Sequence, residues 1–129
     1  MEVIIYNKYW TVDYVRKNDQ YLFIYGDNDV GKGHGGQAVI RDEPNTIGIP
    51  TKKSPSRAWK AYYYDTEYDE NVNKINQAFE KAKNKSQKYL GVVLPGDGFG
   101  TGLANLSKTA PRTLEYINKR TMEFIEELT

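Results

Sequence analysis

Two short glycine-rich segments contain the residue types and spacings in this sequence that are best suited to binding chemistry. The first glycine loop (residues 26–36) has five glycines and the second glycine loop (residues 96–102) has four, out of 11 in the chain. Glycine lets the backbone adopt positive φ and approach a ligand closely. Successive backbone N–H groups can then form a concavity that binds an anion. We therefore expect these segments to bind phosphate or pyrophosphate.

The first glycine loop matches neither of the common nucleotide-binding motifs. The P-loop pattern Gly-x-x-x-x-Gly-Lys-Ser/Thr is absent. Gly31, Gly33 and Gly36 spell the dinucleotide pattern, but they lie five residues beyond the expected strand end, which argues against a nicotinamide-binding Rossmann domain. A flexible hairpin-like loop is the structural alternative. The apolar segments on both sides of the loop favour a ligand-binding role.

Polar residues in the first glycine loop offer hydrogen bonds to a nucleoside. Asp27 and Asn28 stand at a strand end, where either can bind an adenine amino group or a ribose hydroxyl, or simply close a turn. His34 is the only histidine in the chain. It can contact phosphate or act as an acid or base near neutral pH. A solvated loop histidine is the alternative.

The second glycine loop alternates four glycines with other residues over seven positions, which suits neither a helix nor a regular strand. Phe99 or Leu103 is expected to hold this loop on the core. Thr101 can donate its hydroxyl to a phosphate. Asp97 can accept a ribose hydroxyl or a water, or serve a turn. If the protein is an enzyme, Asp97 and His34 are the candidate acid–base pair.

Basic and aromatic residues in the middle of the chain are further candidates. Thr51, Lys52 and Lys53 follow a short expected strand and can neutralise phosphates, or form a solvated basic loop. Trp59 and the tyrosines at positions 62–64 can stack on a base, pack under the long connection or form a dimer contact, and we favour packing. The residues expected to bind ligand are Gly26, Asp27, Asn28, Gly33, His34, Gly35, Gly36, Gln37, Thr51, Lys52, Asp97, Gly98, Phe99, Gly100, Thr101, Gly102 and Leu103.

These residues are positioned by an expected alternation of strands and helices. Apolar runs predict strands at residues 3–6, 21–25, 46–49 and 89–94, with the second ending at Gly26 and the third closed by Pro50. Helices are predicted from Thr11 to Asn18, at 37–41, at 72–82 with Asp65 or Thr66 as cap, and from Pro111. This pattern indicates an α/β protein, in which ligands bind at the carboxyl ends of the strands. If the two buried strands are parallel neighbours, the glycine loops lie side by side.

Composition narrows the class of protein further. The length of 129 residues predicts one domain, residues 1–129. Lys and Arg total 18 against 17 for Asp and Glu, and this balance argues against a nucleic-acid binder. The absence of cysteine and the single histidine argue against a metal site. No apolar stretch is long enough for a membrane span, and the first residues lack a signal-peptide layout, so we expect a cytoplasmic location.

The two glycine loops together resemble the macrodomain superfamily, especially its small members that process ADP-ribose phosphate. The resemblance implies a three-layer α/β/α fold with a mixed sheet. It also implies that the first loop holds pyrophosphate and distal ribose while the second wraps the diphosphate. The Asn-Ala-Ala-Asn motif of the common hydrolases is replaced by residues 25–28, which favours binding over hydrolysis. The matching positions are Gly33, Gly35, Gly36 and Ala38 in the first segment, and Gly98, Gly100, Thr101, Gly102 and Leu103 in the second.

The whole chain is also similar to an uncharacterised family of phage and bacterial proteins. The shared motifs are Phe/Tyr-Gly-Asp-Asn, Gly-Gly-Gln-Ala, Glu-Pro-Asn-x-x-Gly-Ile-Pro-Thr-Lys and Gly-Thr-Gly-Leu-Ala, found here at 25–28, 35–38, 43–52 and 100–104. A phage setting implies a protein that sequesters an NAD-derived immune signal in the host cytoplasm, as an anti-defence sponge.

Three functions remain open from the sequence. The first, which we favour, is binding of ADP-ribose or a cyclic ADP-ribose derivative, without a cofactor. The second is hydrolysis of ADP-ribose 1″-phosphate or of ADP-ribosyl groups. The third is a protein-interaction domain that uses its tyrosines as an interface, and a homo-oligomer is compatible with each.

Overall fold

Four apolar segments form one parallel sheet at the centre of the computed structural model, which describes residues 1–129. The strands are β1 (Glu2–Tyr6), β2 (Tyr21–Asn28), β3 (Thr46–Lys52) and β4 (Gly91–Pro95). Their order is β1-β4-β2-β3, and every pairing is parallel. The α/β class is therefore confirmed, whereas the expectation of a mixed sheet was wrong. Because every pairing is parallel, the carboxyl ends of all four strands lie along one edge of the sheet.

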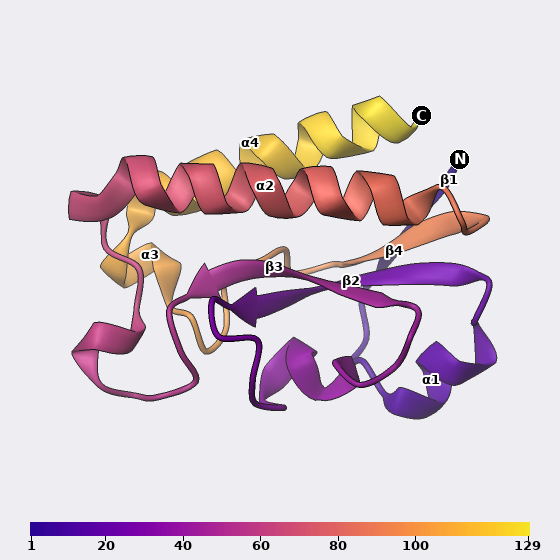
Figure 1. Ribbon diagram of the computed structural model, residues 1–129, viewed down its shortest axis with the longest axis horizontal. Helices are drawn as coiled ribbons and strands as arrows, with labels where there is room; N and C mark the ends of the chain where they lie inside the picture. Colours follow the sequence, from indigo (N-terminus) through magenta and orange to yellow (C-terminus); the bar gives the residue numbers. More distant parts are fainter.

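Helices cover both faces of this sheet (Figure 1). The long helices α2 (Tyr68–Ser86) and α4 (Pro111–Leu128) lie together on one face, and α1 (Val12–Lys17) and the 3-10 helix η1 (Gly36–Ile40) lie on the other. Apolar side chains recur at three- and four-residue spacing along both long helices, so each buries one stripe against the sheet. Each face accordingly has its own apolar cluster, with Phe79 and Phe124 in the larger one and Phe23 and Ile40 in the smaller one.

Strands β2 and β3 continue beyond the residues at which the sequence predicts their ends. β2 runs through Gly26 to Asn28, and β3 runs through Pro50 to Lys52. Proline is tolerated because β3 is an edge strand and has one side free of partners. The extra pairing, which ends with Asn28 opposite Lys52, moves polar side chains of both strands to the carboxyl edge of the sheet.

Helix caps follow the sequence in one case and depart from it in another. Thr11 caps α1 as expected, because its hydroxyl accepts a hydrogen bond from the Tyr14 amide at 3.1 Å. Asp65 does not cap α2; its carboxylate instead accepts from the amides of Arg112 and Thr113 at 2.8 and 3.0 Å. Asp65 therefore satisfies the free N–H groups at the start of α4, 47 positions along the chain, a partnership that no local pattern indicates.

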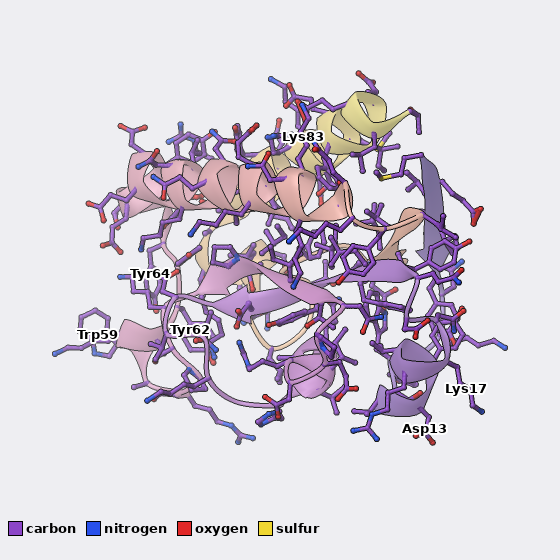
Figure 2. The ribbon with its side chains drawn as sticks, turned by 45° about the vertical axis from the view of Figure 1, so that its right-hand side comes forward. Asp13, Lys17, Trp59, Tyr62, Tyr64 and Lys83 are labelled. Carbon is purple, nitrogen blue, oxygen red and sulfur yellow. The ribbon has the colours of Figure 1, made fainter.

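The connection between β3 and α2 has its own short helices. It contains the 3-10 helices η2 (Trp59–Ala61) and η3 (Asp65–Glu67), and a further short helix, α3 (Leu106–Thr109), precedes α4. Tyr63 is fully buried in the larger apolar cluster, which confirms packing at that position. Trp59 is 69% exposed and points away from the body of the molecule in Figure 2.

Candidate functional site

A cavity of about 950 Å³ opens at the carboxyl ends of the strands. Its walls come from the segments that follow all four strands, so residues as far apart in the sequence as Tyr6 and Ala104 face the same space. Both glycine loops contribute to it. The expected ligand-binding residues that line it are Gly26, Asp27, Asn28, Gly33, His34, Gly35, Gly36, Gln37, Thr51, Lys52, Asp97, Gly100, Thr101, Gly102 and Leu103.

Gln37 joins the two glycine loops directly. Its side-chain oxygen Oε1 accepts a hydrogen bond from the Gly26 amide at 2.7 Å, and its Nε2 donates to the Gly98 carbonyl at 3.0 Å. Gly26 permits this approach, since a Cβ there would lie 3.2 Å from Oε1. One amide side chain thus fixes the distance between the two glycine loops, and its bond to Gly98 spans 61 positions of the chain.

The second glycine loop is anchored through Phe99, whose ring is 1% exposed and packs edge-on against Phe79 at 6.1 Å between centroids. Gly98 and Phe99 do not line the cavity. Leu103, the other expected anchor, is 63% exposed and reaches across to Gly35, where a Cβ would lie 2.9 Å from its Cδ1. Phe99 therefore anchors the loop, whereas Leu103 closes the space between the loops.

Asp27 and Asn28 line the cavity but already have protein partners. The Asp27 carboxylate forms a 2.5 Å ion pair with Arg41, and both side chains are largely buried. The Asn28 side chain accepts from the amides of Val30 and Gly31 and donates to a carbonyl at Lys32. These contacts shape the first glycine loop. A ligand that used either side chain would have to share it with the protein.

The buried environment beside Asp27 also affects a tyrosine. Tyr25 is 5% exposed, and its ring lies 5.5 Å below the Arg41 guanidinium. Burial, together with the negative charge of Asp27, raises the pKa of Tyr25 to about 12. The Tyr25 hydroxyl therefore stays protonated at physiological pH, and it accepts a hydrogen bond from Arg41 at 3.4 Å.

His34 and Asp97 both line the cavity without contacting each other. The imidazole Nε2 of His34 lies 2.8 Å from Oδ2 of Asp42, an exposed residue outside the cavity lining. The Asp97 carboxylate makes no hydrogen bond or ion pair with the protein, although its backbone carbonyl accepts from Thr101 at 3.1 Å. Asp97 is thus the carboxylate in this cavity that remains free to meet a ligand or a water.

Three lysines supply positive charge around the cavity. Lys8 and Lys32 are exposed, and Lys52 is 8% exposed. None of the three takes part in an ion pair. Lys53, which the sequence also suggested, instead pairs with Glu67 at 2.6 Å and does not line the cavity.

The loop between β1 and α1 is the part of the site that the sequence reasoning missed. Residues 6–10 line the cavity, and Tyr9 is 95% exposed beside the buried Trp10. Its position in the sequence was the one signal that could have identified this loop, because it follows a strand of the sheet as both glycine loops do. By contrast, neither Trp59 nor any tyrosine at positions 62–64 lines the cavity.

The structure contains no group of three or more His, Asp or Glu side chains that could hold a metal ion. None of its helices combines the length and the apolar character needed to cross a membrane.

Comparison with known proteins assigns a family without assigning an activity. No curated protein and no solved structure matches the chain significantly. One family model matches residues 5–120, a range that includes all four strands' carboxyl ends and both glycine loops. The chain therefore belongs to a family of unknown function (DUF7831).

Proposed function

We propose that this protein binds an ADP-ribose-type, NAD-derived nucleotide whose diphosphate lies between the two glycine loops. The observation that carries the proposal is that two glycine-rich segments, far apart in sequence, line one cavity and are joined through Gln37. Both loops follow central strands of a parallel sheet, where α/β proteins bind nucleotides.

The chemistry of the cavity supports a diphosphate. Gly33, Gly36 and Gly100 have φ values of +93°, +58° and +82°, so the backbone takes conformations that side-chain-bearing residues rarely adopt. Such turns expose N–H groups, which bind phosphate oxygens in anion-binding concavities. Because Asp27 is neutralised by Arg41, the three unpaired lysines outweigh Asp97, the remaining free carboxylate. A volume of about 950 Å³ is within the range of small-molecule sites.

The loop between β1 and α1 offers a place for the nucleobase. The Tyr9 ring is 95% exposed at the cavity, and stacking of a base on such a ring contributes about 1–3 kcal/mol. β1 is the edge strand next to β4, so Tyr9 stands to one side of the diphosphate site. In this proposal the base lies over β1 and the diphosphate over β4 and β2.

Sequestration is the role that this site supports best. Asp97 and His34 are not in contact, and His34 is paired with Asp42, so the cavity has the elements of binding without an assembled acid–base pair. The resemblance to phage proteins implies a setting in which such a protein would act as a sponge for NAD-derived signals, including cyclic ADP-ribose derivatives.

Calorimetry with ADP-ribose and with cyclic ADP-ribose isomers tests the proposal. We expect saturable binding of at least one of these ligands. Ligand released from the heated complex should have its original mass after prolonged incubation. Absence of binding for all of them would contradict the proposal and would favour a protein-interaction role.

Hydrolysis is the second candidate function, and the free Asp97 carboxylate is the observation that favours it. An exposed carboxylate beside a bound diphosphate is able to orient or activate a water. Conversion of ADP-ribose 1″-phosphate with multiple turnovers would establish an enzyme. In that case Asp97→Asn should abolish turnover, and His34→Ala shows whether the imidazole takes part.

A further inference from the structure

One edge of the sheet is left without a partner. β1 pairs with β4 on one side and with no strand on the other. The Tyr6 carbonyl accepts a hydrogen bond from the Gly96 amide at 2.9 Å, so the polar backbone groups of Tyr6 point toward β4. Because these groups alternate along a strand, the N–H and C=O groups of Val3 and Ile5 point outward. A row of free backbone donors and acceptors is a template for pairing with another strand.

The opposite edge of the sheet is protected in a way that β1 is not. β3 includes Pro50, which has no N–H to donate, and its last residue, Lys52, is bridged by Tyr62. Natural proteins use such features to prevent pairing at an edge. β1 has neither a proline nor an internal charged residue, and it is entirely apolar from Val3 to Ile5. The free side of β1 is thus open to association.

An apolar patch adjoins this open edge. Val3 packs against the larger apolar cluster, so Ile5, two residues further on, points to the same face of the sheet and is 49% exposed. Met122 of α4 is 59% exposed. It lies about 200° around the helix from Arg120, which pairs with Glu80 of α2. Met122 therefore faces away from α2, on the flank of α4 that is nearer β1 (Figure 2).

We propose that this protein forms a symmetric dimer in which β1 pairs antiparallel with β1 of a second copy, with the two-fold axis at Ile5. The outward N–H and C=O groups of the two Ile5 residues then exchange both of their hydrogen bonds. Two sheets of four strands form one sheet of eight, and the apolar flanks of both copies meet beside the axis. Since the same surface serves both copies, association stops at the dimer.

The charges at the two ends of β1 favour a second copy as the partner. Glu2 and Lys8 each lie three residues from Ile5, on opposite sides of it in the sequence. Antiparallel pairing about Ile5 therefore brings Glu2 beside the partner subunit's Lys8, twice in each dimer. Within one copy neither side chain takes part in an ion pair, and Glu2 accepts a hydrogen bond from the neutral Tyr21 hydroxyl.

The two cavities of this dimer lie at opposite edges of the joined sheet, because the strands of the two copies run in opposite directions. Each cavity is complete within one copy, so dimer formation does not depend on the proposed nucleotide. The loop of residues 6–10 lies next to the start of the partner's β1. Lys8 gains a carboxylate at the rim of the cavity, while Lys32 and Lys52 still outnumber the free Asp97.

Light scattering after size exclusion tests the dimer in the absence of any nucleotide. We expect the wild type to have twice the mass of one chain. Ile5→Lys sets like charges opposite each other and should give a monomer with an unchanged circular-dichroism spectrum, because the side chain is half-exposed in the single chain. Trp59→Lys makes the same change on an exposed side chain away from β1 and should remain dimeric. A monomeric wild type, a dimer that survives Ile5→Lys or one that is lost in Trp59→Lys would overturn the inference.

Cysteine cross-linking tests the position of the axis, since the natural chain has no cysteine. In a hydrogen-bonded antiparallel pair the Cα atoms are about 5.5 Å apart, which a disulfide can span. Ile5→Cys should therefore form a covalent dimer under mild oxidation. The two cysteines of Val3→Cys would be four positions out of register, roughly 13 Å apart, and should not cross-link. Trp59→Cys measures random collision, and cross-linking of Ile5→Cys no faster than this control would contradict the axis.

Charge reversal tests the antiparallel register. Glu2→Lys and Lys8→Glu should each weaken the dimer by roughly two- to tenfold, as measured by sedimentation equilibrium. The double variant restores opposite charges across the interface and should recover the association of the wild type. Single reversals without effect, or a double variant that associates no better than the single ones, would rule out this register.

Discussion

Side chains at the carboxyl edge of the sheet fall into two groups. Asp27 and Asn28 are held by other parts of the first glycine loop and shape it. Tyr9 and Asp97 have no hydrogen-bonding partner within the protein and are free to meet a ligand. The two aspartates therefore have different roles. Arg41 neutralises the charge of Asp27, whereas the charge of Asp97 is available to a ligand.

Tyr9 carries the prediction for the nucleobase. Tyr9→Ala removes the exposed ring, and we expect ADP-ribose affinity to fall by roughly tenfold or more, from the usual stacking energy of about 1–3 kcal/mol. Binding of inorganic pyrophosphate should not change, since it has no base. Calorimetry with the two ligands measures both effects. Trp59, which is also exposed (69%) but does not line the cavity, supplies the control, and Trp59→Ala should leave both affinities as they are.

Tyr25 carries a prediction about pH. The folded-state pKa of about 12 is above the ordinary tyrosine value of 10.0, so the folded protein keeps a proton that the unfolded chain releases. The contribution of Tyr25 to stability is complete below pH 10 and is lost as the pH rises toward 12, by at most about 1.4 kcal/mol per pH unit. Urea unfolding across this window should show a shallower decline for Tyr25→Phe. Part of the slope should remain, because burial and the hydrogen bond to Asp29 also raise the pKa of Tyr63. An equal slope in both proteins would contradict the assignment.

At the scale of elements, contacts between segments distant in sequence define the site. The pairing of β2 with β3 through Lys52 delivers that residue to the cavity. Gln37, at the start of η1, holds the two glycine loops together. Asp65 joins the segment before α2 to the first turn of α4.

Asp65→Ala tests the cap of α4. It removes the acceptor for the Arg112 and Thr113 amides, and loss of such a cap costs about 0.5–2 kcal/mol of unfolding free energy. Thr66→Ala is the comparison, because the sequence allowed either residue to cap α2. The exposed Thr66 should change stability by less than about 0.5 kcal/mol. Denaturant unfolding distinguishes the two variants, and a larger loss for Thr66→Ala would favour the local assignment.

Gln37→Glu tests the connection between the glycine loops. A glutamate oxygen can still accept from the Gly26 amide, but it cannot donate to the Gly98 carbonyl, and it adds negative charge beside the diphosphate. We expect roughly tenfold weaker ADP-ribose binding or more, from a lost hydrogen bond and an unsatisfied carbonyl. Gln77→Glu makes the same chemical change on the exposed side of α2 and should bind as the wild type does. Equal affinity in all three proteins would remove the role assigned to Gln37.

At the scale of the whole molecule, the parallel sheet collects four loops at one edge while helices cover both faces (Figure 1). A ligand there contacts the chain at widely separated positions. Amide hydrogen exchange should therefore be slower in the presence of ADP-ribose than in its absence in both glycine loops, residues 26–36 and 96–102. The exchange rates in α4 should change less. Protection of only one loop would contradict joint binding of the diphosphate.

The sequence by itself determined the features that depend on neighbouring residues. Apolar runs located the strands, three- and four-residue spacing located the long helices, and glycine content marked the two loops that line the cavity. The ends of β2 and β3 were misplaced at Gly26 and Pro50, because these residues weaken a strand locally whereas pairing with a neighbour extends it.

Only the tertiary structure decided the sheet order, the partners of Asp27 and Asp65, the burial of Lys52 and the entry of Tyr9 into the cavity. Each of these depends on contacts between segments tens of residues apart. Backbone preference and side-chain periodicity act over a few residues, whereas strand pairing and the choice of an ion-pair partner depend on how both faces of the sheet pack.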